Sequence, residues 1–316
     1  MKSIKKLAIF LSISIAVFYI SLNLYSNQFI AQFENQDFNN YLLESKRLYD
    51  TPIISKFSDS NLLKDEKKHG FISLASPTLV RVPKWIKKPL VKYYLYFSHH
   101  KGEYIKMAYS DSINGRWTIY NDKILSLKNS TLITYRTTQS NLKDVFNHNN
   151  SNETFALLSQ LDFKKNNTSV DSNDPHIASP EIIINNESKE IIIFFHGMVS
   201  GNIQKSKIAI SKDGLNFNAK SKILTGPYLK LVEYKNSYLG ISMSGVFYKF
   251  SKNLKKYETR KRLILETKVR YPSLLIQENI LYLIYSSVGD IPRKIVYRKI
   301  NLDNSDWNKW KAGPEH

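Results

Sequence analysis

The sequence contains no cysteine, which excludes both disulfide bonds and thiolate metal sites. Acidic residues are also scarce, with 27 Asp and Glu against 46 Lys and Arg, so the formal net charge is +19. The lysines are scattered, and there is neither an arginine-rich arm nor a nucleic-acid-binding motif. Such a surface would attract anionic membranes or acidic polysaccharides, although a general bias towards Lys, Asn and Ile is the simpler explanation. We expect no nucleic-acid partner.

Aromatic residues, by contrast, are abundant. They make up 13% of the 316 residues, with 20 Tyr and 16 Phe, which is too many for a disordered chain. A chain of this length can bury a sizeable core. Its apolar segments are short and rich in β-branched residues, and this composition favours an all-β class.

The N-terminus carries an export signal. Lys2, Lys5 and Lys6 precede an uncharged apolar run from Leu7 to Tyr25. About 19 residues at about 1.5 Å each just span a hydrocarbon core. The run is either a cleaved signal peptide or an uncleaved signal anchor, and Leu24, where a small residue should precede a cleavage site, favours the anchor. The rest of the chain is then expected outside the cytoplasm, on the periplasmic or extracytoplasmic side, either attached to the membrane or secreted.

Three regions follow from this pattern: a signal segment at 1–27, a polar stalk at 28–70 and a β domain at 71–316. The β domain repeats one plan four times, with three short strands, a polar turn and a closing aromatic residue. The repeats begin near Ala75, Ser179, Tyr228 and Tyr271, and their closing aromatics are Trp117, Phe217, Tyr257 and Trp307.

Four-stranded units repeated about every 40 to 50 residues are typical of a β-propeller. Between Ile124 and Asn173 the spacing is longer, and Leu132–Tyr135 and Phe155–Ser159 supply two further candidate strands. That segment, or the stalk together with the C-terminal tail, would complete one more blade. We therefore predict an all-β fold, a five-bladed propeller after the N-terminal helix, with four or six blades as alternatives.

Polar side chains gather where the first strand of each repeat begins. The hairpin from Asn173 to Ser200 shows this best, because antiparallel pairing places His176 and Ser179 beside His196. Applying the same rule to every repeat collects further side chains on one rim. The collected residues include Ser76, His99, His100, Glu181, Tyr228, Arg270, Tyr271 and Asp290. Convergent polar groups in a concavity indicate a ligand site.

Several strings in these repeats resemble the five-bladed glycoside hydrolases of family 43, of the arabinanase and levansucrase type, and look like a divergent bacterial branch. The strings are Ser76–Pro83, Lys92–Phe97, Ser179–Ile184 and Thr225–Lys230, and the resemblance covers roughly Gly70 to Trp310. It implies a protein that acts on a poly- or oligosaccharide in the central pocket.

The chain departs from this family at the positions that carry its chemistry. The resemblance implies an Asp before Pro in blade one, a second Asp before Pro in blade two and a Glu before Gly-Pro in blade three. Here these positions are Ser76, Ser179 and Thr225. Hydroxyl groups cannot replace the two carboxylates that glycoside hydrolysis needs.

A rearranged catalytic set is one interpretation, with Glu181 as base and His176 or Asp290 as acid. His99, His100, His196, Ser179, Tyr228 and Arg270 would then bind substrate, with Arg270 and Tyr228 supplying a guanidinium fork and a stacking face. An inter-blade ion pair and a core aromatic are the alternative roles of the last two. No cofactor is indicated, although the histidines and carboxylates would also suit a divalent metal.

Three functions stay open on the sequence alone. The first is a glycoside hydrolase-like enzyme with non-standard catalytic residues, and the second is a carbohydrate-binding propeller without catalysis. The third is a scaffold whose channel has no ligand. The missing acids favour the second, whereas the resemblance to hydrolases favours the first.

Overall fold

A computed structural model of the chain describes the residues from 49 to 316 with gaps. The described residues are 49–55, 58, 74–99, 102–134, 174–200, 203–243, 245–260, 263–265, 269–287, 289–292 and 294–316. The predicted signal segment, almost all of the stalk, the candidate strand Phe155–Ser159 and His100 lie outside them. Among the residues that the structure describes, no helix combines the length and apolarity needed to cross a membrane.

The chain divides into two compact units, residues 1–53 and 54–316. In the first unit only residues 49–53 are described, and they form neither helix nor strand. The second unit contains every described strand.

These strands form four antiparallel sheets, each made of consecutive segments. The first sheet contains β1 (Leu74–Arg81), β2 (Tyr93–His99), β3 (Tyr104–Ser110), β4 (Thr118–Ile119) and β5 (Leu125–Ser126), which is followed by the 3₁₀ helix η2 (Leu127–Asn129). The second contains β6 (Ile177–Asn185), β7 (Glu190–Ser200), β8 (Ile203–Ser211) and β9 (Asn218–Ala219). The third contains β10 (Lys230–Tyr234), β11 (Ser237–Ile241), β12 (Phe247–Ser251) and β13 (Tyr257–Thr259). The fourth contains β14 (Val269–Gln277), β15 (Ile280–Ser287), β16 (Val296–Asn301) and, after the 3₁₀ helix η5 (Trp307–Lys309), β17 (Ala312–Glu315).

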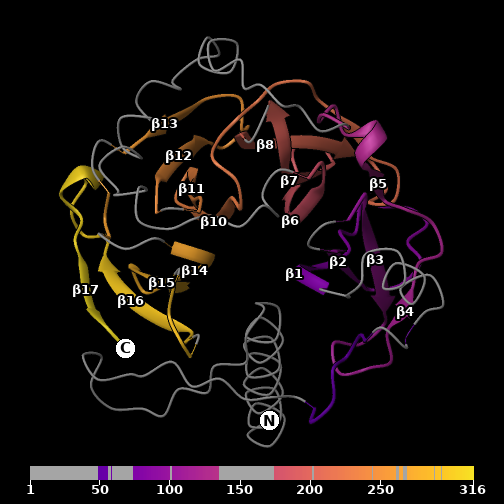
Figure 1. Ribbon diagram of the computed structural model, residues 1–316, viewed down its shortest axis with the longest axis horizontal. Coiled ribbons are helices and arrows are strands. Elements are labelled where there is room, and N and C mark those ends of the chain that lie inside the picture. The colour runs from indigo at the N-terminus through magenta and orange to yellow at the C-terminus, as the bar shows by residue number, and fades with distance from the viewer. Residues whose placement is uncertain are drawn as a thin grey trace, which may run out of the picture. The chain divides into compact units, whose positions relative to one another are not determined.

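Figure 1 shows these sheets around a common centre in chain order, with β1, β6, β10 and β14 innermost. The fold is an all-β propeller whose described residues form four blades, not the predicted five. Two of the segments expected to build a fifth blade behave differently. Residues 132–134 contain no strand, and the C-terminal tail forms β17, which pairs with β16 at the outer edge of the fourth sheet.

The second and third sheets each pack against a neighbouring sheet on both faces. In β7, Ile191, Ile193 and Phe195 join the core shared with the first sheet. The alternate residues Ile192 and Phe194 join the core shared with the third sheet. Because successive side chains of a strand point to opposite faces, a strand buried on both faces reads as a continuous apolar run. This packing explains the Ile-rich segments of the sequence.

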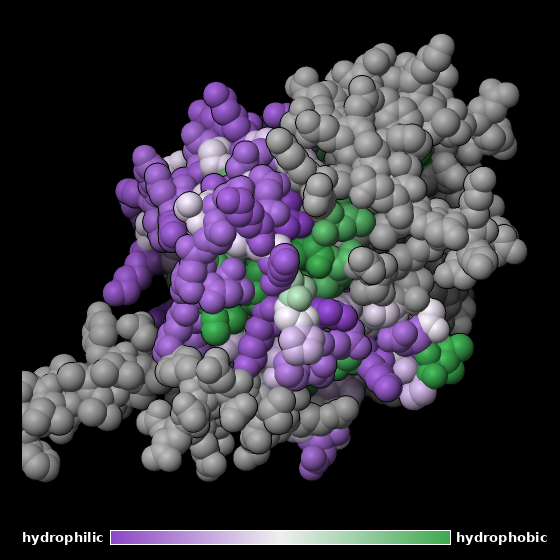
Figure 2. Space-filling model, turned by 90° about the vertical axis from the view of Figure 1, so that its left-hand side faces the viewer, coloured by the Kyte–Doolittle hydropathy of each residue, from purple (hydrophilic) through white to green (hydrophobic). Residues whose placement is uncertain are grey.

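The described surface is mostly hydrophilic (Figure 2). Figure 2 shows one side of the molecule, on which hydrophilic residues cover most of the described surface and hydrophobic residues show only in small areas. Ile291 and Ile295 are the most exposed large hydrophobic side chains that the structure describes, at 95% and 83%.

The turn before the closing aromatic has a structural role in the second sheet. Asp213 Oδ1 accepts hydrogen bonds from the backbone N–H groups of Leu215 and Asn216 and from the Ser211 hydroxyl. Burial alone would raise the pKa of Asp213, but the hydrogen bonds from Asn216, Leu215 and Ser211 outweigh it and lower the pKa.

The closing aromatics open or precede the fourth strand in the first three sheets, as predicted. In the fourth sheet Trp307 lies instead in η5, and β17 starts only at Ala312. The Asp306 side chain accepts a hydrogen bond from the backbone N–H of Asn308, which caps this short helix.

Candidate functional site

Three of the four inner strands share one irregularity at the end where they begin, and we call this end of the propeller the mouth. In β1, β6 and β14 the pairing with the next strand shifts by one residue, between Ala75 and Thr78, Ala178 and Glu181, and Arg270 and Ser273. In the third sheet Pro227 takes the equivalent place, because its carbonyl accepts a hydrogen bond from Met243 N at 2.9 Å. Each shift is a β-bulge that inserts one extra residue.

One residue of every bulge has left-handed backbone geometry. These bulge residues are Ser76, Ser179, Tyr228 and Tyr271, with φ of 49°, 53°, 59° and 51°. None is glycine, so each conformation costs about 1 to 3 kcal/mol and persists only because the surrounding sheet imposes it. Because these four strained residues stand at equivalent positions around the propeller centre, the mouth is a candidate functional site.

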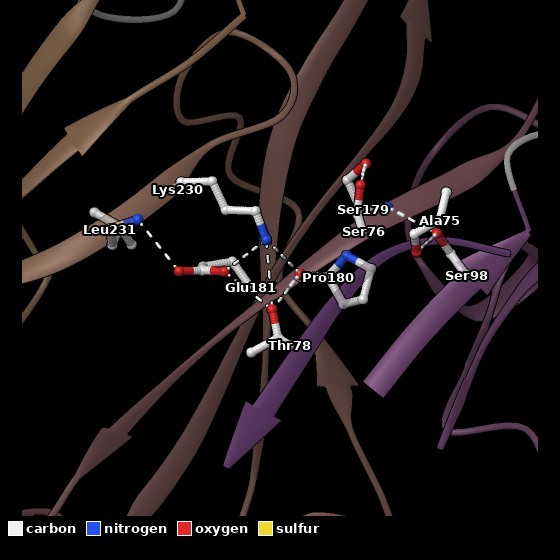
Figure 3. Close-up of polar contacts among 9 residues, drawn as sticks. All are labelled: Ala75, Ser76, Thr78, Ser98, Ser179, Pro180, Glu181, Lys230 and Leu231. Atoms are coloured by element: carbon white, nitrogen blue, oxygen red, sulfur yellow. Dashed lines mark hydrogen bonds and ion pairs between the residues drawn. The ribbon is translucent and has the colours of Figure 1, made fainter. Parts of the chain in front are cut away.

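Hydroxyl groups meet at the mouth between the first two blades. The Ser76 and Ser179 hydroxyl oxygens lie 3.0 Å apart and are hydrogen-bonded, and Ser179 N donates to Ser98 Oγ at 3.0 Å (Figure 3). Ser179 is buried, whereas Ser76 is partly exposed. These two serines occupy the positions at which the family resemblance implies two aspartates. The described geometry therefore provides a hydroxyl pair in place of a carboxylate pair.

Below the bulge residues lies a second tier, two residues further along each inner strand. Its members are Thr78, Glu181, Lys230 and Ser273. Glu181 Oε2 accepts hydrogen bonds from Lys230 Nζ at 2.8 Å and from Thr78 Oγ1 at 3.0 Å, and its Oε1 accepts from Leu231 N at 3.3 Å (Figure 3). The Lys230 and Glu181 side chains are only 15% and 14% exposed. Both carboxylate oxygens of Glu181 are thus already engaged by donors from this chain, and its catalytic role stays a prediction.

Aromatic rings form a row along the mouth from the second blade to the fourth. Ring centroids are 5.5 Å apart for His176 and His196, 4.1 Å for His196 and Tyr228, and 5.9 Å for Tyr228 and Tyr271. Arg270 ends this aromatic row, with its guanidinium carbon 4.9 Å from the Tyr271 ring centroid. The row joins four of the predicted site residues to Tyr271, which is also a bulge residue.

Burial favours the uncharged forms of two members of the row, His176 and Tyr228. Burial lowers the pKa of His176, although a hydrogen bond to the Asp174 carbonyl opposes this shift. Since that carbonyl accepts from Nδ1 at 2.7 Å, the neutral ring carries its proton on Nδ1. Burial also raises the pKa of Tyr228 to about 12, with a further increase from Tyr271 and a decrease from Arg270. A buried neutral imidazole and a neutral phenol suit ligand contact better than acid catalysis.

Two other predicted site residues lie elsewhere. Asp290 is exposed in the loop after β15, and it makes no hydrogen bond or ion pair with any residue that the structure describes. His99 is buried at the end of β2, next to Ser98. Adjacent strand residues point to opposite faces, so His99 faces away from the Ser98 hydroxyl that contacts Ser179. His100 lies outside the described residues.

Thr78, Lys230 and Ser98 were not among the predicted site residues. Thr78 and Lys230 each lie two residues after a bulge residue, as Glu181 does, and this shared spacing is the sequence signal that would have identified them. Ser98 lies opposite Ala75, in the register that His196 occupies opposite Ala178. Within the described part of the chain, no three His, Asp or Glu side chains gather closely enough to hold a metal ion.

Comparison with known proteins identifies one distant relative in sequence and several similar solved structures. No family model matches the chain. The chain is 24% identical over 265 residues to an uncharacterised protein of Acanthamoeba polyphaga mimivirus. That match covers 76% of this chain and 65% of the relative, so the chain spans less than two thirds of the relative's length.

Solved structures similar to this chain are family 43 glycoside hydrolases. One is a β-xylosidase/α-arabinofuranosidase from a compost microbial metagenome, in complex with xylotriose, at 13% identity and TM-score 0.48, covering 77% of this chain and 78% of that one. Another is a family 43 enzyme from Xanthomonas citri, at 9% identity and TM-score 0.49, with coverages of 77% and 74%. A third is an exo-β-1,3-galactanase from Phanerochaete chrysosporium with β-1,3-galactotriose, at 11% identity and TM-score 0.48, with coverages of 78% and 50%. At these identities and TM-scores, the similarities do not decide the activity of this chain.

Proposed function

We propose that this propeller binds a carbohydrate at the mouth and does not hydrolyse glycosidic bonds. The observation that carries the proposal is the hydrogen-bonded pair Ser76 and Ser179, which stands where a carboxylate pair would be needed. The one carboxylate of the second tier, Glu181, is ion-paired with Lys230. A hydrolase of this type requires one free carboxylate and one carboxylic acid on either side of the bond.

The remaining groups at the mouth match sugar chemistry. Ser76 and Tyr271 are partly exposed, and their hydroxyls both donate and accept hydrogen bonds. The partly exposed Tyr271 ring supplies an apolar face of the kind on which a sugar ring packs. Ligand sites typically combine such aromatic lining with a few placed polar groups. The mouth therefore contains the hydroxyl groups and the aromatic ring that carbohydrate binding requires.

A paired binding and turnover experiment tests the proposal. The full-length chain, purified in a detergent without a sugar headgroup, is screened on a glycan array and in parallel with the same glycans as hydrolysis substrates. Tyr271→Ala is compared with Tyr93→Ala, a half-buried tyrosine at the opposite end of β2. We expect binding without turnover, and a loss of about tenfold or more in affinity for Tyr271→Ala only.

Other outcomes overturn the proposal in different directions. Turnover that disappears in Glu181→Gln while binding is retained would establish the glycoside hydrolase-like enzyme. Absence of both binding and turnover across a broad glycan panel would favour the scaffold. Equal losses of affinity in Tyr271→Ala and Tyr93→Ala would show that the ligand binds away from the mouth.

A further inference from the structure

The charges at the mouth are unbalanced. We consider the four-residue segment of each blade that runs from the residue before the bulge residue to the second tier. These four segments contain three charged side chains, Glu181, Lys230 and Arg270. Glu181 and Lys230 neutralise each other at 2.8 Å. Arg270 is therefore the source of net charge in this set of residues, and the mouth carries a formal charge of +1 there.

Arg270 is also held in a defined place. One of its terminal nitrogens donates a hydrogen bond to the Tyr271 hydroxyl at 3.2 Å, and its guanidinium lies against the Tyr271 ring. The side chain is partly exposed, and no Asp or Glu among the described residues lies within ion-pair distance of it. A guanidinium has five N–H donors in a planar fork, so most of its donors stay available to a ligand. An arginine fixed on an aromatic ring loses little further entropy when it binds an oxyanion.

The chain also carries uncharged side chains at positions where the family resemblance implies acidic ones. The resemblance implies acidic residues at Ser76, Ser179 and Thr225, and each of these three positions carries an uncharged hydroxyl. Two carboxylates beside a bound anion would each repel it, whereas hydroxyl groups can donate hydrogen bonds to it. The positive charge of the whole chain, +19, would also raise the rate at which an anionic ligand arrives.

We propose that the carbohydrate bound at the mouth is acidic, and that Arg270 binds its anionic group while Tyr271 contacts the sugar ring. This inference rests on the proposed function and adds the class of sugar. Carboxylate and phosphate groups share the oxygen geometry that pairs with a guanidinium fork. The ligand is therefore a saccharide that carries a uronate carboxylate or a phosphate ester.

Calorimetry on the full-length chain, in the same sugar-free detergent, tests the proposal with four probes. The probes are a galacturonic acid trisaccharide, a hexose phosphate, a neutral galactose trisaccharide and inorganic phosphate alone. We expect at least one acidic sugar to bind about tenfold or more tightly than the neutral trisaccharide, with an affinity that falls as salt is added. The first two probes distinguish a carboxylate from a phosphate.

Two variants locate the effect. Arg270→Gln should lower the affinity for the acidic sugar about tenfold or more, and Arg270→Lys, which keeps the charge but not the fork, should fall between Arg270→Gln and the unmodified chain. Arg81→Gln is the matched control, because Arg81 is exposed at the far end of β1 and its replacement changes the net charge equally. Thermal melting of each variant shows whether it is folded.

The outcomes separate this inference from the proposed function. Equal or tighter binding of the neutral trisaccharide would contradict the inference and leave carbohydrate binding intact. Binding of inorganic phosphate as tight as that of the acidic sugar would also contradict it, since the sugar would then contribute nothing. An equal loss of affinity in Arg81→Gln and Arg270→Gln would show a general charge effect instead of a site at Arg270. Failure of every sugar to bind would remove the proposed function as well.

Discussion

Four residues in the same left-handed conformation carry two kinds of chemistry. The bulge residues of blades one and two are serines joined by a hydrogen bond, and those of blades three and four are tyrosines in edge-to-face contact. The backbone irregularity is thus common to the propeller, and the side chains at it determine what the mouth can bind. In this protein they offer hydroxyls and aromatic faces, beside a single guanidinium at Arg270.

His176 should make stability fall as the pH is lowered. Burial lowers its pKa below the ordinary value of 6.5, so the unfolded chain takes up a proton more readily than the folded one. The contribution of neutral His176 to stability is therefore complete above pH 6.5 and is lost as the pH falls towards the lowered folded-state pKa. Thermal melting from about pH 7.5 to about pH 5 should show a fall in Tm that is smaller in His176→Phe. An identical fall in both proteins would refute this assignment.

At the scale of the element, the inner strands are defined by where their regular pairing breaks. The strands β1, β6 and β14 each have regular antiparallel pairing after the bulge and a single extra residue near the start. The bulge turns the first residues of the strand out of register with the rest. At the mouth Ser76 meets Ser179 and Tyr228 meets Tyr271, while Thr78, Glu181 and Lys230 of the second tier meet one another.

The bulge predicts that glycine, compared with alanine, stabilises the fold at Ser76 and destabilises it at Ser273. At Ser76, with φ of 49°, Ser76→Gly should be about 1 kcal/mol more stable than Ser76→Ala, because glycine adopts this conformation without strain. Both variants lose the Ser179 hydrogen bond, so that loss cancels in the comparison. At Ser273, which lies in the regular part of β14, alanine should instead exceed glycine by about 0.5 to 1 kcal/mol.

Urea denaturation of the four variants measures these differences. An alanine at position 76 that is as stable as glycine would mean that the left-handed conformation is not present in solution.

For the whole molecule, the contact that matters most is the one among Thr78, Glu181 and Lys230, because these residues come from three different blades. Thr78 Oγ1 is within hydrogen-bond distance of Glu181, and Lys230 Nζ reaches Glu181 and, at 3.4 Å, Thr78. The apolar cores join blades only in consecutive pairs. The polar cluster links the first, second and third blades at once.

Removing the charge of Glu181 should therefore destabilise the propeller. Glu181→Gln leaves the ammonium of Lys230 largely buried without its partner, and we expect a loss of about 2 to 3 kcal/mol in the free energy of unfolding. This is below the range for fully buried pairs because both side chains keep 14–15% exposure. Glu181→Gln combined with Lys230→Met should lose less than Glu181→Gln alone, since no unpaired charge remains.

Chemical denaturation of Glu181→Gln, Lys230→Met and the double variant gives the coupling energy between Glu181 and Lys230. Additive losses would show that the ion pair contributes no interaction energy to the fold.

Much of the fold could be predicted from local pattern. Segments of Ile, Phe and Tyr between polar turns identified the three long strands of every sheet, because strand residues alternate between two buried faces at short range. The number of blades could not be predicted in this way. The short apolar segment at 132–134 resembles a strand in composition, yet residues 132–134 form none, and the C-terminal residues 312–315 complete an existing sheet.

By itself, the sequence determined that hydroxyl-bearing, aromatic and histidine residues stand where inner strands begin, since antiparallel pairing along a hairpin depends only on near neighbours in the chain. Only the tertiary structure decided which side chains from different blades meet. Glu181 pairs with Lys230, 49 residues away, and Ser76 with Ser179, 103 residues away, whereas Asp290 is exposed in the loop after β15. The physical reason is that ion pairs and hydrogen bonds between blades depend on the packing of one sheet against the next, which no periodicity within a single strand specifies.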